Sequence, residues 1–312
     1  MCVRQERFEA LARYVSKHYP VVPLDEQEPA WGNEQRTPRL AFTFDDGWTD
    51  NADIAAPIAR KYGTPFCIFI CPSKVGLQLP FWPERVATVL KIIRSSKEAI
   101  DKAEGLLAAW AGIGPACIPD LRKPDAVEPL VELLKSRPNS EREEIILQLL
   151  DSAGMRGGLS TNGTADSTMT WAEIRFLRAA GVIFGSHTKS HQMLTRIPLG
   201  EAQREVTEAK EEIEKTLECR CVLFSYPNGD WSWQVRNLVG QAGYRLAFTN
   251  QPGTWTSECD PLLIPRVNIW EGKLVGFSGS FSPIAFEYAT FWKAYRAEKR
   301  QVVRQADRGI AE

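Results

Sequence analysis

The chain has 312 residues, with 38 Lys+Arg against 39 Asp+Glu and a formal net charge of −1. A content of 44 % hydrophobic and 25 % charged residues is typical of globular proteins, so intrinsic disorder and fibrous structure are excluded. The balanced charge argues against nucleic acid as a partner, because nucleic-acid binders usually carry a basic excess.

The sequence predicts a cytoplasmic protein with reduced thiols. No stretch approaches the roughly 18 apolar residues that a membrane-spanning helix needs, and the segment from Met1 to Tyr14 lacks the apolar core of a secretory signal. The seven cysteines are odd in number and form no CxxC pair. Cys219 and Cys221 are too close in sequence for a relaxed disulfide, so we expect free thiols packed as small hydrophobic groups.

Short apolar strands alternate with longer helices along most of the chain. We expect helices at 8–18, 51–62, 171–180, 200–218 and 232–242, and strands at 40–44, 65–71, 182–184, 222–226, 245–249 and 263–269. This alternation predicts an α/β fold with a parallel sheet or barrel.

One region carries only helical patterns, at 84–99, 103–110, 129–134 and 140–150. We therefore predict a helical insertion at 81–169, whose role the sequence leaves open. It would interrupt a barrel formed by 39–80 and 170–275. An N-terminal helix and lead-in (1–38) would precede the barrel, and a C-terminal helix and tail (276–312) would follow it.

Polar groups follow the predicted strands at their carboxyl ends, where active sites of parallel α/β folds lie. These groups are Asp45-Asp46, His187 and His191, the segment SYPNGD at 225–230, and Arg266. We expect the fold to bring them together.

His187 and His191 are two of only three histidines and are four residues apart. On a helical turn both rings would project from one face, as two nitrogen ligands of a first-row metal do. The alternative is a pair of ordinary core or surface histidines. A carboxylate from another strand end would complete a site with open positions, which is typical of catalytic metal centres.

Asp45 and Asp46 are costly to bury as two neighbouring anions unless something compensates their charge. A cation resolves this cost if one carboxylate is a ligand and the other acts as a base. Gly47 allows a tight turn beside them. The alternative is a strand-end turn in which the aspartates cap a helix.

Three segments resemble the polysaccharide deacetylases of carbohydrate esterase family four, which carry the NodB-homology domain: AFTFDDGWTDN (41–51), GSHTKSHQML (185–194) and FSYPNGD (224–230). The likeness spans most of residues 8–270 and is strongest to a branch found with bacterial surface-polysaccharide biosynthesis. The resemblance implies a distorted (β/α) barrel.

The resemblance also implies roles for the motif residues. Asp46, His187 and His191 would bind a divalent metal, with zinc expected and Co²⁺, Ni²⁺ or Mn²⁺ as alternatives. Asp45 would be the general base, and the backbone N–H of Asn228 would hold the oxyanion. The residues expected to line the sugar pocket are Tyr226, Pro227, Asp230, Trp231 and Trp48, with core or loop packing as the alternative.

The sequence departs from the family pattern in two places. The arginine that usually orients the base is absent at Phe224-Ser225, and Arg266 is the expected substitute, with a solvent-facing arginine at the barrel rim as the alternative. No histidine follows His191 to serve as the general acid. The remaining candidates are a water on the metal, Asp45 returning its proton, and Asp230.

The C-terminal run at 285–306 is predicted to be a helix with Tyr288, Phe291, Trp292 and Tyr295 on one face and basic residues after it. Docking of this helix on the barrel is the simpler interpretation. Peripheral contact with an anionic inner membrane is the alternative.

The expected function is metal-dependent N-deacetylation of an N-acetylated amino sugar in a bacterial surface-glycan precursor, either the O-antigen of lipopolysaccharide or an exopolysaccharide. The expected location is the cytoplasm, including the inner face of the membrane. One alternative is hydrolysis of another C–N bond, in an N-formyl sugar or a small amide or imide. Another is a glycan-binding homologue without turnover. The sugar and the oligomeric state are not readable from the sequence.

Overall fold

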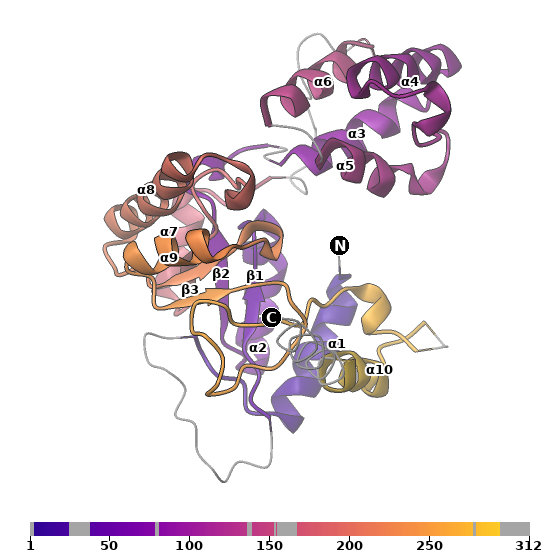
Figure 1. Cartoon of the computed structure of the whole chain (residues 1–312). Helices are drawn as coiled ribbons and strands as arrows, with labels where there is room; N and C mark the ends of the chain where they lie inside the picture. Colours follow the sequence, from indigo (N-terminus) through magenta and orange to yellow (C-terminus); the bar gives the residue numbers. More distant parts are fainter. Residues whose placement is uncertain are drawn as a thin grey trace, which may run out of the picture. The chain divides into compact units, whose positions relative to one another are not determined.

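The computed structural model describes residues 3–24, 38–78, 81–135, 139–152, 154, 167–276 and 279–293. Within it the chain divides into two compact units (Figure 1). One unit comprises residues 1–76 and 169–312, and the other comprises residues 77–168.

The first unit is built on a curled sheet that forms part of a barrel. Among the described residues its strands are β1 (Phe42–Phe44), β2 (Phe66–Ile70), β3 (Ile183–Ser186), β4 (Leu223–Ser225) and β5 (Leu246–Phe248). The strands are all parallel and lie in the order β1-β2-β3-β4-β5. The predicted α/β class is therefore confirmed.

Helices connect these strands, as the sequence pattern predicted. The connecting helices are the π-helical turn η1 (Asn51–Ala55), α2 (Ala56–Tyr62), α7 (Trp171–Ala179), α8 (Leu199–Leu217) and α9 (Trp233–Gln241). A further helix, α1 (Gln5–His18), precedes β1, and α10 (Pro283–Glu287) and the π-helical turn η9 (Tyr288–Trp292) follow β5. Short 3₁₀ turns lie at Pro72–Lys74, Leu194–Arg196, Pro227–Gly229 and Glu271–Lys273. Local chemistry sets the helix ends. Gly63, with φ 63°, ends α2, and Thr170 forms a capping box with Glu173 at the start of α7.

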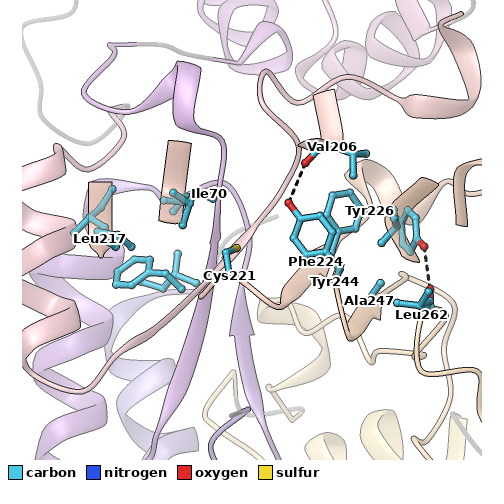
Figure 2. Close-up of a cluster of buried hydrophobic side chains, with 14 of the residues drawn as sticks. Ile70, Val206, Leu217, Cys221, Phe224, Tyr226, Tyr244, Ala247 and Leu262 are labelled. Atoms are coloured by element: carbon cyan, nitrogen blue, oxygen red, sulfur yellow. Dashed lines mark hydrogen bonds between the residues drawn. The ribbon is translucent and has the colours of Figure 1, made fainter. Parts of the chain in front are cut away.

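Strand β2 is buried along its whole length, so its side chains fill cores on both faces of the sheet. Ile68 and Ile70 belong to the core that includes residues of α7, α8 and α9, whereas Cys67 and Phe69 pack with residues of β4 and β5. Figure 2 shows the first of these cores around Phe224. A parallel sheet covered on both faces explains why these strands are continuous apolar runs rather than alternating ones.

The second unit consists of helices with a hydrophobic core of their own (Figure 1). Its longer helices are α3 (Trp82–Ile93), α4 (Lys97–Ala111), α5 (Val127–Lys135) and α6 (Asn139–Ser152), with 3₁₀ turns at Pro115–Cys117 and Pro124–Ala126. The expectation of one continuous helix at 84–99 is wrong. The hydroxyl of Ser96 accepts a hydrogen bond from the backbone N–H of Ala99 (3.3 Å) and starts α4 there.

The expected last strand at 263–269 is also wrong. Among the described residues of that segment, Ile264 forms only an isolated bridge with Phe248. The backbone N–H of Arg266 instead donates to the carbonyl of Gln251 (3.0 Å), which lies beyond the end of β5. The pairing therefore stops after one residue, and Arg266 follows β5 on a loop.

The C-terminal aromatic residues do not share one face. The Phe291 ring packs against Tyr19 with 5.3 Å between centroids, whereas the side chains of Tyr288 and Trp292 are exposed. The inserted π turn rotates the residues out of the register of an ideal α-helix. Tyr295 and the basic residues after it lie outside the described residues.

No disulfide joins any of the cysteines that the structure describes. Within the described parts of the chain, no helix has both the length and the apolar character needed to span a bilayer.

Candidate metal centre

The carboxyl ends of the strands bring together polar residues that are far apart in sequence. Asp45 and Asp46 directly follow β1, and His187 directly follows β3. Parallel strands all end at the same edge of the sheet, so residues at positions 45 and 187 become neighbours.

Asp46, His187 and His191 form a compact group of potential metal ligands, with one donor atom from each within 4.8 Å of the others. Oδ1 of Asp46 lies 3.6 Å from Nε2 of His187 and 3.4 Å from Nε2 of His191. Ligands held at about 2.1 Å from one zinc ion in a tetrahedron are about 3.4 Å apart. The observed spacings therefore fit donors arranged around a single small cation.

An unsatisfied oxygen in the same group also fits a cation. Oδ1 of Asp46 is buried and has no hydrogen-bond partner, although its other oxygen accepts a hydrogen bond from the indole N–H of Trp48 (3.3 Å). Buried polar atoms without partners are rare in folded proteins and need an explanation. Two imidazole nitrogens and a carboxylate are a donor set suited to zinc and other first-row divalent ions.

The two histidines are not on a helical turn, so that expectation is wrong. They lie on a loop in which Thr188 and His191 both have φ 65°, in the left-handed region. For residues other than glycine, such a conformation costs on the order of 1–3 kcal/mol and tends to occur at functional sites. The hydroxyl of Thr188 accepts a hydrogen bond from the backbone N–H of His191 (3.0 Å) and so stabilises the bend.

His187 is held in one tautomer. Its Nδ1 lies 2.7 Å from the carbonyl oxygen of Ser225, and only 2 % of its side chain is exposed. A carbonyl oxygen can only accept, so Nδ1 carries the proton and Nε2 directs its lone pair toward Asp46. Burial lowers the pKa of His187, which keeps the ring neutral at neutral pH. This arrangement is that of a histidine prepared to bind a metal.

Asp45 is paired with Arg266, as the sequence predicted. Two parallel hydrogen bonds join them: Nη1 of Arg266 to Oδ1 of Asp45 (2.8 Å), and Nη2 to Oδ2 (2.7 Å). Only 12 % of the Arg266 side chain is exposed, so the alternative of a solvent-facing arginine at the barrel rim is wrong. The bidentate geometry fixes the plane of the Asp45 carboxylate.

Four further residues hold Arg266, and of these only Ser225 lay within a segment that the sequence analysis expected at the site. They are Thr43, Ser225 and Asn250, whose side-chain oxygens accept hydrogen bonds of 3.2, 2.9 and 2.8 Å, and Thr249, whose carbonyl accepts one of 3.0 Å. All four lie within or just after β1, β4 or β5. Their position near strand ends was the only signal in the sequence, because nothing in the residue types distinguishes them from ordinary strand-end turns.

The two aspartates have opposite electrostatic environments. Burial alone would raise the pKa of Asp45, but the charge of Arg266, acting together with the charge of His187 and the hydrogen bonds from Arg266 and Ser225, outweighs burial and holds this pKa well below its ordinary value. Burial raises the pKa of Asp46, and the neighbouring charge of Asp45 raises it further. The protein therefore compensates the charge of Asp45 with a buried arginine, whereas the charge of Asp46 has no comparable partner among the described residues.

The turn after β4 contributes several of the predicted pocket residues. Asn228 has φ 56° and Gly229 φ 70°, and a side chain on Gly229 would meet the backbone N of Asn250 at 2.3 Å. Pro227 is buried, and Asp230 accepts a hydrogen bond from the hydroxyl of Thr195 (2.6 Å). The turn is thus tightly packed against the segment that follows β5.

The aromatic residues expected in the pocket differ in their placement. The half-buried Trp231 packs its ring edge-on to Trp233 at 5.4 Å. Tyr226, in contrast, has a fully buried side chain whose hydroxyl donates to the carbonyl of Leu262 (2.9 Å; Figure 2). The prediction that the Tyr226 side chain lines the pocket is therefore wrong, because residue 226 points to the face of the sheet covered by the helices.

Comparisons with known proteins support this fold. Residues 136–247 match the family model described as polysaccharide deacetylase, and the matched segment contains both histidines. No curated protein matches the chain.

Two solved structures have a similar fold. The Streptococcus pyogenes deacetylase PplD, determined in complex with acetate, aligns with 13 % identity and a TM-score of 0.55, covering 92 % of this chain and 87 % of that one. IcaB from Ammonifex degensii aligns with 15 % identity and a TM-score of 0.51, covering 93 % and 89 %. The resemblance to polysaccharide deacetylases with a NodB-type fold is therefore confirmed.

Proposed function

We propose that this chain is a metal-dependent N-deacetylase that acts on an N-acetylated amino sugar of a bacterial surface-glycan precursor. The observation that carries the proposal is the pairing of Asp45 with Arg266 beside the compact group of Asp46, His187 and His191. The family match and the acetate bound to the structurally similar Streptococcus pyogenes deacetylase support hydrolysis of an acetamide.

A divalent ion, with zinc as the expected one, would polarise the amide carbonyl and lower the pKa of a coordinated water to about 7. Asp46 would supply the carboxylate ligand, and the two histidines would supply nitrogen ligands. The tautomer of His187, held by the carbonyl of Ser225, leaves Nε2 free for this role.

Asp45 is proposed to take the proton from the attacking water. Its low pKa keeps it ionised at neutral pH, and the two hydrogen bonds from Arg266 fix its orientation. The backbone N–H of Asn228 is proposed to stabilise the negative charge that develops on the carbonyl oxygen. The left-handed conformation of Asn228 suits a backbone group held in one orientation.

The general acid is proposed to be a group other than histidine, because His18 is the only histidine besides the two proposed ligands. His18 stacks on Tyr14 of α1, with 4.3 Å between ring centroids. Asp45, once protonated, can return its proton to the leaving amine. Asp230 is the second candidate, and Trp231 and Trp48 are proposed to contact the sugar.

The proposed location is the cytoplasm, where an O-antigen or exopolysaccharide precursor would be the substrate. The exposed side chains of Tyr288 and Trp292 support peripheral contact with the inner membrane.

The division into a barrel, a helical insertion at 81–169 and a C-terminal segment is retained as a proposal for how the chain is organised.

A second candidate function follows because no histidine after His191 is present to act as the general acid. A homologue without an efficient acid would bind an N-acetylated glycan with little turnover, because losing one acid costs about 10²–10⁴ in rate. Hydrolysis of an N-formyl sugar or a small amide uses the same ligands and base, so the released acid distinguishes these reactions.

The test measures acetate, formate and ammonia released from N-acetylhexosamine-containing substrates by zinc-loaded protein, with Asp46→Ala as the control. Acetate release that Asp46→Ala abolishes supports the proposal. Formate or ammonia release favours another C–N bond, and binding without product favours the glycan-binding homologue. Acetate release that persists undiminished in metal-stripped Asp46→Ala would refute the assigned site.

A further inference from the structure

A carboxylate from a neighbouring helix binds the loop that carries His191. Glu205 lies on α8, and only 9 % of it is exposed. One carboxylate oxygen accepts the backbone N–H of Ser190 (2.8 Å), and the other accepts the Ser190 hydroxyl (2.6 Å). Both oxygens of a nearly buried carboxylate are thus satisfied by the residue that directly precedes a proposed metal ligand.

The same loop is also held at Lys189. The backbone N–H of Lys189 donates to the backbone carbonyl of Glu205 (3.0 Å). The carbonyl of Lys189 accepts from both the backbone N–H (3.0 Å) and the hydroxyl (2.7 Å) of Ser73. The peptide groups just before His191 are therefore anchored on two sides, by α8 and by the turn after β2.

This anchoring matters because the loop is strained. Thr188 and His191 both adopt left-handed backbone angles that residues other than glycine avoid. A strained loop keeps such a conformation only if its surroundings hold it there. The carboxylate of Glu205 provides charge-assisted hydrogen bonds for this purpose, which are stronger than neutral ones.

We infer that Glu205 is a positioning residue that acts through Ser190 to hold His191 where it can ligate the metal together with Asp46 and His187. This inference rests on the proposed metal-dependent function. Glu205 is not a catalytic residue, since its contacts are with the loop and not with the donor atoms themselves.

Glu208 offers a matched control on the same helix. It pairs with the ammonium group of Lys189, on the same loop, but through a partly exposed contact between side chains. Exposed ion pairs contribute little and do not fix a backbone conformation. Replacing Glu208 by Gln removes a carboxylate of equal size near the loop and leaves the anchoring of Ser190 intact.

The experiment measures the zinc affinity of metal-stripped protein by competition with a chromophoric chelator, and the visible spectrum of the Co²⁺ complex. We expect Glu205→Gln to weaken zinc binding about 10–100-fold, as changes behind metal ligands do, and to alter the Co²⁺ spectrum. Glu208→Gln is expected to retain the wild-type affinity and spectrum. An effect confined to the thermal stability of the metal-free protein would mean that Glu205 is merely structural and would overturn the inference.

Ser190→Ala tests the same contact without removing the buried carboxylate. It replaces Glu205→Gln in the experiment if Glu205→Gln does not fold. It loses one of the two hydrogen bonds and is expected to weaken zinc binding about threefold or more. Unchanged affinity in Ser190→Ala would contradict the inference. In the double variant with Glu205→Gln, the effects should not add, because both act through one contact.

Asp46→Ala distinguishes a failure of the proposed function from a failure of the role inferred for Glu205. Equal zinc affinity in the wild type and Asp46→Ala would overturn the proposed function, and the inference with it. Zinc binding that depends on Asp46 but is unchanged by Glu205→Gln would overturn only the inference.

Discussion

Two neighbouring aspartates on one edge of the sheet differ in how their charge is satisfied. The carboxylate of Asp45 receives two hydrogen bonds from Arg266, which is itself held by surrounding polar groups. The carboxylate of Asp46 retains a buried oxygen without a hydrogen-bond partner, close to two imidazole nitrogens. The protein alone completes the first region, whereas the second has the features of a site that a cation completes.

The largest expected effect comes from Asp46→Asn. This change removes the charged ligand but suits the left-handed backbone, because Asn tolerates φ near 73°. We expect zinc binding to be lost and turnover to fall more than about 10³-fold. The melting temperature of the metal-free protein should not fall, because an uncompensated buried charge is removed. A marked loss of stability without metal would contradict the contrast between the two regions.

Asp45→Asn should differ from Asp46→Asn in its zinc binding and in its stability without metal. Turnover is expected to fall about 10²–10⁴-fold because the proposed base is lost, while zinc binding is retained. The metal-free protein should be destabilised by about 3 kcal/mol, since Arg266 keeps its buried charge without a partner. Denaturant unfolding and a zinc titration on the same sample check both parts. Full activity in this variant would show that the base is assigned wrongly.

Arg266→Met tests the pairing through its pH dependence. In the wild type the folded-state pKa of Asp45 is below its unfolded value, so the stability it contributes is present above about pH 4 and is lost as the pH falls further. Without Arg266, burial raises this pKa above the unfolded value, and the carboxylate destabilises the fold at neutral pH.

The difference in unfolding free energy between wild type and Arg266→Met should therefore be largest at neutral pH, about 3 kcal/mol, and shrink as the pH falls toward and below about pH 4. Urea denaturation of the metal-free proteins between pH 3 and pH 7 measures it. A difference that is independent of pH would indicate lost packing rather than a lost ion pair.

The smallest expected effect is that of Trp48→Phe. It removes the indole N–H bond to Asp46 (3.3 Å) but keeps an aromatic side chain. One long hydrogen bond is worth about 0.5–1 kcal/mol, so zinc affinity should fall only about two- to fivefold. Trp231→Phe, at a residue without a described bond to the ligands, is the matched control for metal binding. A loss as large as that of Asp46→Asn would mean that the ligand set is incomplete.

Much of the fold was predictable because its elements carry strong local signals. The apolar run of β2, the helix that ends at Gly63 and the capping box at Thr170 are all readable from sequence. The errors occurred where a long-range or capping interaction outweighed the local pattern. Ser96 divided an apparently continuous helix, and the segment near Ile264 formed only one bridge with the sheet.

The site was predictable in its residue types and less so in its geometry. The Asp45-Asp46 pair, the two histidines and Arg266 were all identified, and the structure brings them to one edge of the sheet. The helical turn assumed for the histidines was wrong, because Thr188 and His191 adopt backbone angles that no spacing rule predicts. Tyr226 was misplaced, since its direction depends on the strand register.

The sequence by itself determined which chemical groups follow the strand ends, because strand and helix periodicity together with the order of the motifs are local properties. Only the tertiary structure decided which groups meet. Arg266 reaches Asp45 across 221 residues of chain, and Glu205 of α8 contacts the loop before His191. Such contacts depend on parallel strands ending at one edge and on the packing of helices against them, which no single segment of the chain encodes.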